Sequence, residues 1–388
     1  MLHNGYSIVL PATLDGLIQS PPTTSNLLNV HHDRDALKSW LSEFQNSPNT
    51  YRAYEKEGLR FLYWLHIEYQ CTFAEVRKNH IHAYRVFLMN PQPAEFWCTP
   101  HKDRGKIAKQ QQWRPFSGPL GLRSIQTAMT ILSGLFEYLR DAAYVPANPF
   151  SLIKQKVVET FDLEERKIQM MERILTLSEF QLLYNALYSD NATERYSPSW
   201  IARSRFILLF MGYLGLRVSE FVNAKWDNFI YRENCWWIIV TGKGRKTARV
   251  PVNNHCLDAI NQYRAAFDLP MLSLESLNND PICFSFLPSG QPVFEKPLTQ
   301  RSVHMICRAI ADLAIQNGAT SSAFEHFSPH WLRHFSASMQ AQSDIPFAMI
   351  KAHHRHSKDE TTRIYLHHDD KIRHDWSQKY QIPIKTKP

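Results

Sequence analysis

Polar side chains that could do chemistry gather in a short stretch near residue 330. Ser328-Pro329 is typical of a helix start, because a hydroxyl can cap the helix and proline suits its first position. On such a helix His330, Arg333 and His334 fall at i, i+3 and i+4 and therefore share one face. One guanidinium and two imidazoles on a single face favour binding of an anion, although a surface helix with scattered polar residues has the same pattern.

A second group of reactive side chains follows further along the chain. His356 can donate or accept a proton near neutral pH, and Tyr365 carries a hydroxyl that can act as a nucleophile. Since a tyrosine with a pKa of ~10 is mostly neutral at pH 7, attack by its oxygen requires a group that takes the proton. Taken alone, Tyr365 fits packing in a core as well as it fits catalysis.

Two cations lie upstream of these stretches. Arg217 follows Gly215 at the end of an apolar helix, where a charge without an anionic partner would be costly. Glu220 is its simplest partner, and an anionic ligand is the alternative. Lys243 lies in the string GKGRK between two predicted strands, where it can contact a phosphate or remain in water. This string lacks the GxxxxGK[ST] spacing of a nucleotide-binding P-loop.

The composition narrows the class of partner. The chain has 388 residues, enough for two domains, and 44% of them are hydrophobic, as in globular proteins. A formal net charge of +8 suits a polyanion such as nucleic acid. The six cysteines include no CxxC pair, which argues against a zinc ribbon or a disulfide framework and favours a reducing compartment. The sequence shows neither a signal peptide nor an apolar run of ~20 residues, so we expect a cytoplasmic protein without a membrane partner.

The first half of the chain has the pattern of a small helical domain. Residues 1–32 read as an irregular arm, 33–150 as the helical domain, and 151–175 as a linker of mixed charge. Residues 91–121 read as a long, basic, proline-rich insertion that either contacts a ligand or is simply solvated. Helices are predicted from Asp33, after a cap at Thr50, over residues 78–89, and after a cap at Ser124.

The reactive residues belong to a second predicted domain, residues 176–388. Thr176 and Glu179 have the spacing of a capping box, which predicts a helix start. A buried helix is predicted from about Ser199 to Gly215.

The same domain contains one predicted β-hairpin. Residues 235–240 and 247–252 are rich in β-branched and aromatic side chains and are predicted to pair. Residues 281–297 are predicted to be a loop between helices. The fold class is therefore mainly α with a small β-sheet.

The polar residues occur in an order that resembles the tyrosine recombinase (phage integrase) family. The resemblance rests on the sequence motifs GLRVSE, TGKGRK, HWLRH and TTRIY, and it extends from about residue 176 to 366. It implies a two-domain architecture, with a helical core-binding domain and a mixed α/β catalytic domain. It also implies six catalytic residues, which are Arg217, Lys243, His330, Arg333, His356 and Tyr365.

The resemblance assigns a role to each of these residues. Tyr365 attacks a DNA phosphodiester and forms a 3′-phosphotyrosyl bond, which conserves the energy of the phosphodiester for rejoining. His330 and His356 donate hydrogen bonds or take the phenol proton, and Lys243 protonates the leaving 5′-oxygen.

Two arginines complete the implied site. The planar forks of Arg217 and Arg333 suit the phosphate oxygens, where charge builds up during the reaction. Glu220 supports the active-site groups. Neither a metal, a cofactor nor ATP is required.

The implied partner is double-stranded DNA with inverted half-sites. The family acts as a homotetramer on DNA, so we expect a monomer when free and a tetramer during strand exchange. The tail from residue 366 either docks on a neighbouring subunit or folds back on its own domain. The implied setting is the integration, excision or resolution of a mobile element in the bacterial cytoplasm, in association with the nucleoid.

Three alternative functions compete with this interpretation. A type IB topoisomerase-like enzyme would relax DNA with overlapping motifs, and a DNA-binding protein could keep the fold without catalysis. A metal hydrolase would use His330, His334 and the histidines at 353–356, but the sequence lacks HExxH.

One position departs from the family pattern. The family commonly has Leu-Gly before the second motif histidine, whereas this chain has His354-Arg355. The departure puts the placement of His356 in doubt, and it makes His353 and His354 alternatives for its role.

Overall fold

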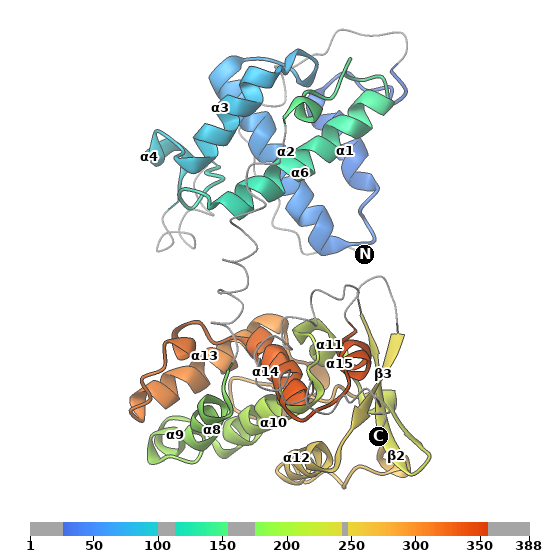
Figure 1. The fold of residues 1–388 in the computed structure, drawn as a ribbon, viewed down its shortest axis with the longest axis vertical. Coiled ribbons are helices and arrows are strands. Elements are labelled where there is room, and N and C mark those ends of the chain that lie inside the picture. Colours follow the sequence, from blue (N-terminus) through green and yellow to red (C-terminus); the bar gives the residue numbers. More distant parts are fainter. Residues whose placement is uncertain (1–25, 100–112, 154–174, 243–246, 356–388) are drawn as a thin grey trace, which may run out of the picture. The chain divides into compact units, whose positions relative to one another are not determined.

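The chain forms two compact units in a computed structural model that describes residues 26–99, 113–153, 175–242 and 247–355 (Figure 1). The N-terminal unit comprises residues 1–158 and the C-terminal unit residues 159–388. Each unit has its own hydrophobic core. In the part of the chain that the structure describes, no helix is both long and apolar enough to cross a bilayer.

The regular elements of the N-terminal unit, over its described residues, are all helices joined by turns and irregular segments. Helix α1 packs on α2 and α6, and α3 packs on α6. The ring of Phe61, near the centre of the core, contacts other aromatic rings at 4.9–6.4 Å between centroids. The elements are α1 (Asp33–Ser42), α2 (Pro48–Tyr69), η2 (Phe73–Glu75), α3 (Lys78–Met89), α4 (Ala94–Trp97), α6 (Leu122–Asp141) and η4 (Pro149–Leu152).

The predicted helices are present, but two predicted caps are wrong. Helix α2 begins at Pro48 rather than after Thr50, because proline at the first position has a backbone angle that already suits a helix. Helix α6 begins at Leu122, and its N-cap residue is Gly121. Ser124 therefore lies within the first turn, where its N–H bonds the carbonyl of Gly121 at 2.9 Å.

The basic insertion predicted over residues 91–121 is not an irregular, solvated loop at its two ends, which include α4 and pack into the core. Trp97 and Phe116 are fully buried, and the Phe116 N–H donates to the Trp97 carbonyl at 3.2 Å. The guanidinium of Arg60 lies 4.6 Å from the centre of the Phe116 ring and donates to the Pro115 carbonyl. Burial of two large aromatic rings holds these ends in the core. Residues 100–112, which carry most of the charge, lie outside the described residues.

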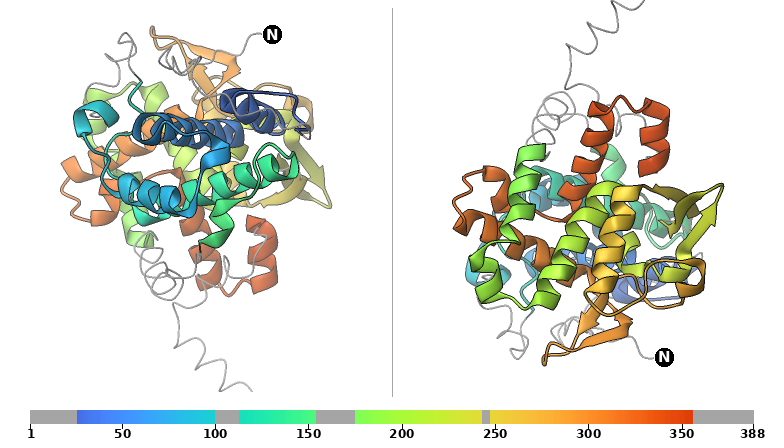
Figure 2. Two further views of the ribbon diagram at one scale, coloured as in Figure 1. Left: turned by 90° about the horizontal axis from the view of Figure 1, so that it is seen from above. Right: turned by 90° about the horizontal axis from the view of Figure 1, so that it is seen from below.

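The C-terminal unit packs helices around α10. Helix α10 lies against α12, α13 and α14, and Figure 2 shows α10 and α12 side by side. The helices are α8 (Leu177–Ala186), α9 (Asp190–Arg195), α10 (Pro198–Leu214), α11 (Val218–Asn223), α12 (Asn254–Ala265), α13 (Gln300–Gln316), α14 (Pro329–Gln342) and α15 (Phe347–His354), with 3-10 turns η5 (Trp226–Asn228), η7 (Leu274–Ser276) and η8 (Ser322–His326).

The capping box predicted at the start of this unit is confirmed. The Thr176 N–H donates to Glu179 Oε2 at 2.8 Å, and the Glu179 N–H donates to Thr176 Oγ1 at 3.2 Å. Each residue satisfies a backbone donor that the first turn of α8 would otherwise leave without a partner.

Two small antiparallel sheets complete the C-terminal unit. The predicted hairpin is confirmed as β2 (Cys235–Thr241) paired with β3 (Thr247–Val252), and Thr241 lies opposite Thr247. A strand that the sequence did not reveal, β1 (Phe229–Arg232), pairs with the other edge of β2.

The second sheet corrects the loop predicted over residues 281–297. Strands β4 (Phe284–Phe286) and β5 (Pro292–Pro297) form a separate two-stranded sheet there. Two of its prolines lie at the ends of β5, at an edge where a missing N–H is tolerated. Because proline is uncommon inside strands, these prolines led to the prediction of a loop.

Candidate active site

The site is built at the C-terminal end of α10, where Gly215 ends the helix. Gly215 has φ +56°, in the left-handed region that favours glycine. A Cβ atom at this position would lie 2.3 Å from His354 Cε1 and 3.0 Å from Ser336 Oγ. The absence of a side chain therefore lets α14 and α15 both approach the end of α10.

Arg217 follows this turn as the N-cap residue of α11. Its Nη1 donates to Glu220 Oε1 at 2.8 Å, and its backbone N–H donates to Glu220 Oε2 at 2.8 Å. The Glu220 side chain is only 1% exposed, whereas that of Arg217 is 40% exposed. The carboxylate partner predicted for Arg217 is thus confirmed, and the guanidinium still reaches solvent.

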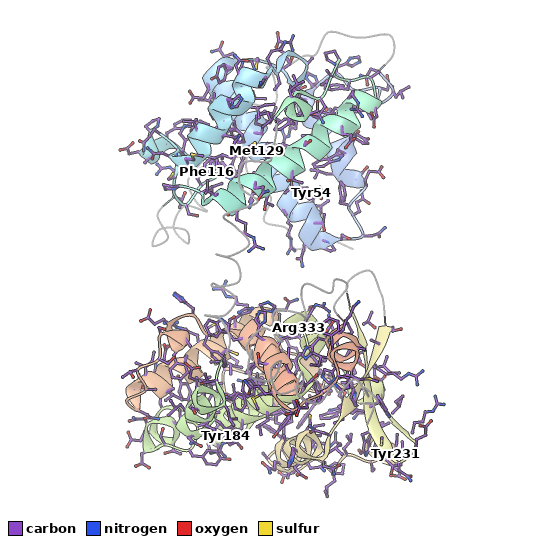
Figure 3. The ribbon with its side chains drawn as sticks, in the orientation of Figure 1. Tyr54, Phe116, Met129, Tyr184, Tyr231 and Arg333 are labelled. Atoms are coloured by element: carbon purple, nitrogen blue, oxygen red, sulfur yellow. The ribbon has the colours of Figure 1, made fainter. Side chains whose placement is uncertain are left out.

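Arg333, labelled in Figure 3, lies on α14 and contacts the ends of α10 and α15. Its Nη1 donates to the Gly215 carbonyl at 2.5 Å and its Nη2 donates to the His354 carbonyl. These carbonyls terminate α10 and α15, and the negative ends of two helix dipoles favour a cation between them. Arg333 is buried, so the surface-helix interpretation of this stretch is wrong for this residue.

The two histidines of the same helix lie together. The rings of His330 and His334 are 4.3 Å apart between centroids, as expected from their i, i+4 spacing. His330 is exposed and His334 is buried. Pro329 is at the first position of α14 as predicted, but the Ser328 hydroxyl makes no capping hydrogen bond.

Glu220 binds a second cation, Arg355. Arg355 Nη2 donates to Glu220 Oε2 at 2.6 Å, while its Nη1 donates to the His353 carbonyl at 2.8 Å. Burial raises the pKa of Glu220, but the Arg217 N–H and the charges of Arg355 and Arg217 outweigh it, so this pKa is lowered. Glu220 is therefore an anion held between two arginines.

His353 and His354, the alternatives to His356, both pack against the end of α10. The His353 Nε2 lies 3.1 Å from the Leu214 carbonyl, which requires Nε2 to carry the hydrogen. Burial, with the charge of Arg355, lowers the pKa of His353 to about 4, so the ring is neutral at pH 7. The His354 side chain is fully buried beside Gly215.

The predicted site residues are only partly covered by the described chain. Arg217, Glu220 and Arg333 converge on the end of α10, and His330 lies one turn from Arg333 on α14. Lys243, His356 and Tyr365 lie outside the described residues. Among the residues that are described, no three His, Cys, Asp or Glu side chains form a group that could hold a metal ion.

Sequence reasoning missed Arg355 as a partner of Glu220. The two residues are far apart in the sequence, and neither motif predicts their contact. The one signal was the charged residue immediately before the motif histidine His356.

Comparison with known proteins places this site in a family. The sequence model described as the phage integrase family matches residues 173–371, just over half of the chain. The chain belongs to the phage integrase family, and it is an enzyme of the tyrosine-type site-specific recombinase class. Tyrosine recombinase XerC of Pediococcus pentosaceus is 24% identical over 252 residues, which are 65% of this chain and 73% of that protein.

Solved structures share the fold. The XerH site-specific recombinase bound to palindromic difH substrate, in a post-cleavage complex, has a TM-score of 0.57 at 16% identity, over 91% of this chain and 86% of that one. The Tn1549 transposon integrase in complex with a circular intermediate DNA has a TM-score of 0.56 at 13% identity, over 90% and 99% of the two chains. The predicted family and the mainly helical fold class are confirmed.

Proposed function

We propose that this protein cleaves and rejoins DNA at specific sites through a 3′-phosphotyrosyl intermediate on Tyr365. The observation that carries the proposal is the convergence of Arg217 and Arg333 on the end of α10. Each guanidinium is fixed by hydrogen bonds to protein groups, Arg217 by Glu220 and Arg333 by the Gly215 carbonyl. Two fixed cations suit a phosphate that gains negative charge as it reacts.

The reaction balances without a metal or cofactor. The phenol oxygen of Tyr365 forms a bond to phosphorus while the bond from phosphorus to the 5′-oxygen breaks. His356 or His330 accepts the phenol proton, and Lys243 gives a proton to the departing 5′-oxygen. Rejoining is the same sequence in reverse, with a 5′-hydroxyl as the attacking group.

The arginines act as donors to the two non-bridging phosphate oxygens. Arg217 keeps 40% of its side chain exposed while Glu220 fixes one edge, which supports direct contact with DNA. Arg333 is buried between two helix ends, where little solvent screens its charge. Glu220 is the residue that positions Arg217.

The wider assembly is part of the same proposal. We propose that residues 33–150 form a core-binding domain after an arm of residues 1–32, and that residues 151–175 link it to the catalytic domain, residues 176–388. Two compact units with separate cores support this division. The partner is duplex DNA with inverted half-sites, bound by a monomer that assembles into a tetramer.

The tail from residue 366 then docks on a neighbouring subunit. The cellular setting we propose is the bacterial cytoplasm, on DNA of the nucleoid, during integration, excision or resolution of a mobile element. The formal net charge of +8 supports a DNA partner.

Covalent trapping tests the function. Duplexes from the DNA flanking the gene, each nicked near a candidate crossover point, lose a short fragment after cleavage, so the protein remains attached. We expect an adduct on a subset of sites, unchanged by a metal chelator. Adducts on every duplex alike, with relaxation of any supercoiled plasmid, would indicate a topoisomerase. Cleavage that stops on chelation would indicate a metal hydrolase.

A further inference from the structure

The backbone at Arg355 has an unusual conformation for a residue with a long side chain. Arg355 caps α15 with φ 54° and ψ 44°, the left-handed conformation in which glycine is the usual residue. Its N–H bonds the Ala352 carbonyl at 3.1 Å, so the helix end itself needs no side chain. A side chain at this position costs free energy in the backbone, and a contact made by the guanidinium can offset that cost.

The guanidinium of Arg355 closes a three-residue network. Its Nη2 lies 2.6 Å from Glu220 Oε2, and Glu220 Oε1 accepts from Arg217 Nη1 at 2.8 Å. The Arg217 Nη2 lies 3.4 Å from the Arg355 carbonyl. The Arg355 side chain is 12% exposed and that of Glu220 1%, so solvent screens their interaction poorly.

The charges of this network decide what Arg217 can offer to DNA. Two guanidiniums and one carboxylate leave a net charge of +1, whereas Arg217 and Glu220 alone sum to zero. In the absence of Arg355, the buried carboxylate would cancel the field of Arg217 at a bound phosphate. With Arg355 present, Glu220 can orient Arg217 while the network stays cationic.

We propose that Arg355 is a positioning residue that shares the charge of Glu220 and thereby keeps Arg217 available to the scissile phosphate. The proposal rests on the proposed cleavage reaction. On this proposal, the arginine that precedes His356 balances the negative charge of the Glu220 carboxylate.

Single-turnover cleavage of a nicked duplex, with protein in excess, tests this proposal. Two neutral substitutions that accept the left-handed conformation, Arg355→Asn and Arg355→Gly, should each lower the rate about tenfold, because the net charge of the three-residue network falls from +1 to 0. Arg355→Lys should retain most of the rate because it retains the charge. A loss confined to Arg355→Gly would assign the effect to backbone freedom next to His356 and overturn the proposal.

A second substitution separates charge sharing from a merely structural role. Glu220→Gln keeps a hydrogen-bonding side chain and removes the negative charge. In the Arg355→Asn background it should raise the cleavage rate, since the net charge returns to +1, so the two substitutions are not additive. Additive rate losses, or equal rates for wild type and Arg355→Asn, would overturn the proposal.

The same variants distinguish failure of the proposal from failure of the function. A wild-type chain that forms no adduct on any duplex would reject the proposed cleavage. The contact between Arg355 and Glu220 is then tested by comparing the urea midpoints of wild type, Arg355→Asn, Glu220→Gln and the double variant. Coupled midpoints would support the shared carboxylate, and additive midpoints would reject it.

Discussion

Glu220, Arg333 and Arg355 lie at the end of α10 where water solvates them poorly, and each has a partner of the opposite polarity. Glu220 lies between Arg217 and Arg355, and Arg333 lies between the carbonyls that end two helices. A buried charge that loses its partner is strongly destabilising, so these contacts act as a set. The site therefore holds its arginines in place before DNA arrives.

His353 gives the site a dependence on pH. Burial, together with the charge of Arg355, lowers its pKa from the ordinary value of 6.5 to about 4 in the folded chain, so the neutral ring is favoured by folding. The contribution of this residue to stability is complete above about pH 6.5 and is lost as the pH falls toward about 4, because only the unfolded chain takes up the proton there.

The expected result is a difference between wild type and a His353→Gln variant that changes with pH. The glutamine amide can still donate to the Leu214 carbonyl but does not titrate. As the pH is lowered from 7 to 4, the urea midpoint of the wild type should fall more steeply than that of His353→Gln. Parallel curves would mean that His353 does not remain neutral in the folded chain.

The residue types of the site could be read from the sequence, but the network around Glu220 could not. Arg217, Arg333 and His330 follow from motif spacing, and Glu220 follows from its i, i+3 relation to Arg217 on a short helix. The pairing with Arg355 depends on the packing of α15 against α10 and on a left-handed residue. No local pattern encodes either feature.

At the scale of elements, the close approach of α14 and α15 to α10 depends on one glycine. The Gly215→Ala variant combines left-handed strain with a clash against His354. Strain and overpacking together should lower the free energy of unfolding by about 2–4 kcal/mol. The variant should also lose cleavage, because the anchors of Arg333 move.

Two matched glycines serve as controls for this prediction. Gly290 also has a left-handed φ, +84°, but no atom lies within 4 Å of its added Cβ, so Gly290→Ala reports strain alone. Gly134 lies within α6, and a Cβ added there would lie 3.9 Å from Trp40 Cζ2, an ordinary contact distance. Because alanine favours a helix more than glycine does, Gly134→Ala should change stability little or increase it. Equal losses at Gly215 and Gly290 in urea unfolding would argue against the clash.

The elements themselves were predictable to different degrees. Long amphipathic or apolar helices such as α6 and α10 are predicted by the spacing of their apolar residues. The hairpin of β2 and β3 is predicted by its β-branched residues. The strands β4 and β5 are short and lie among prolines, and the ends of residues 91–121 are held by single aromatic rings. Such contacts are set by tertiary packing rather than by a local pattern.

The whole molecule is a basic chain with two cores, and its charge should govern how it binds DNA. Neutralising each phosphate releases counterions, so the logarithm of the binding constant falls linearly with the logarithm of salt concentration at about −0.9 per phosphate. A site covering six or more phosphates predicts a slope steeper than about −5.

This salt dependence is measured by titrating a half-site duplex at several salt concentrations. The wild-type chain provides the slope, and a scrambled duplex of equal length separates the electrostatic part from sequence recognition. A slope near zero would contradict DNA as the partner.

Replacement of a single oxygen shows whether Tyr365 is the nucleophile. Tyr365→Phe removes the hydroxyl and leaves the ring, so binding to a half-site should stay within about threefold of wild type. On a nicked duplex that traps the wild-type chain, we expect no covalent adduct from the variant under denaturing electrophoresis. An adduct of undiminished yield would show that another residue attacks the phosphate and that Tyr365 is not the nucleophile.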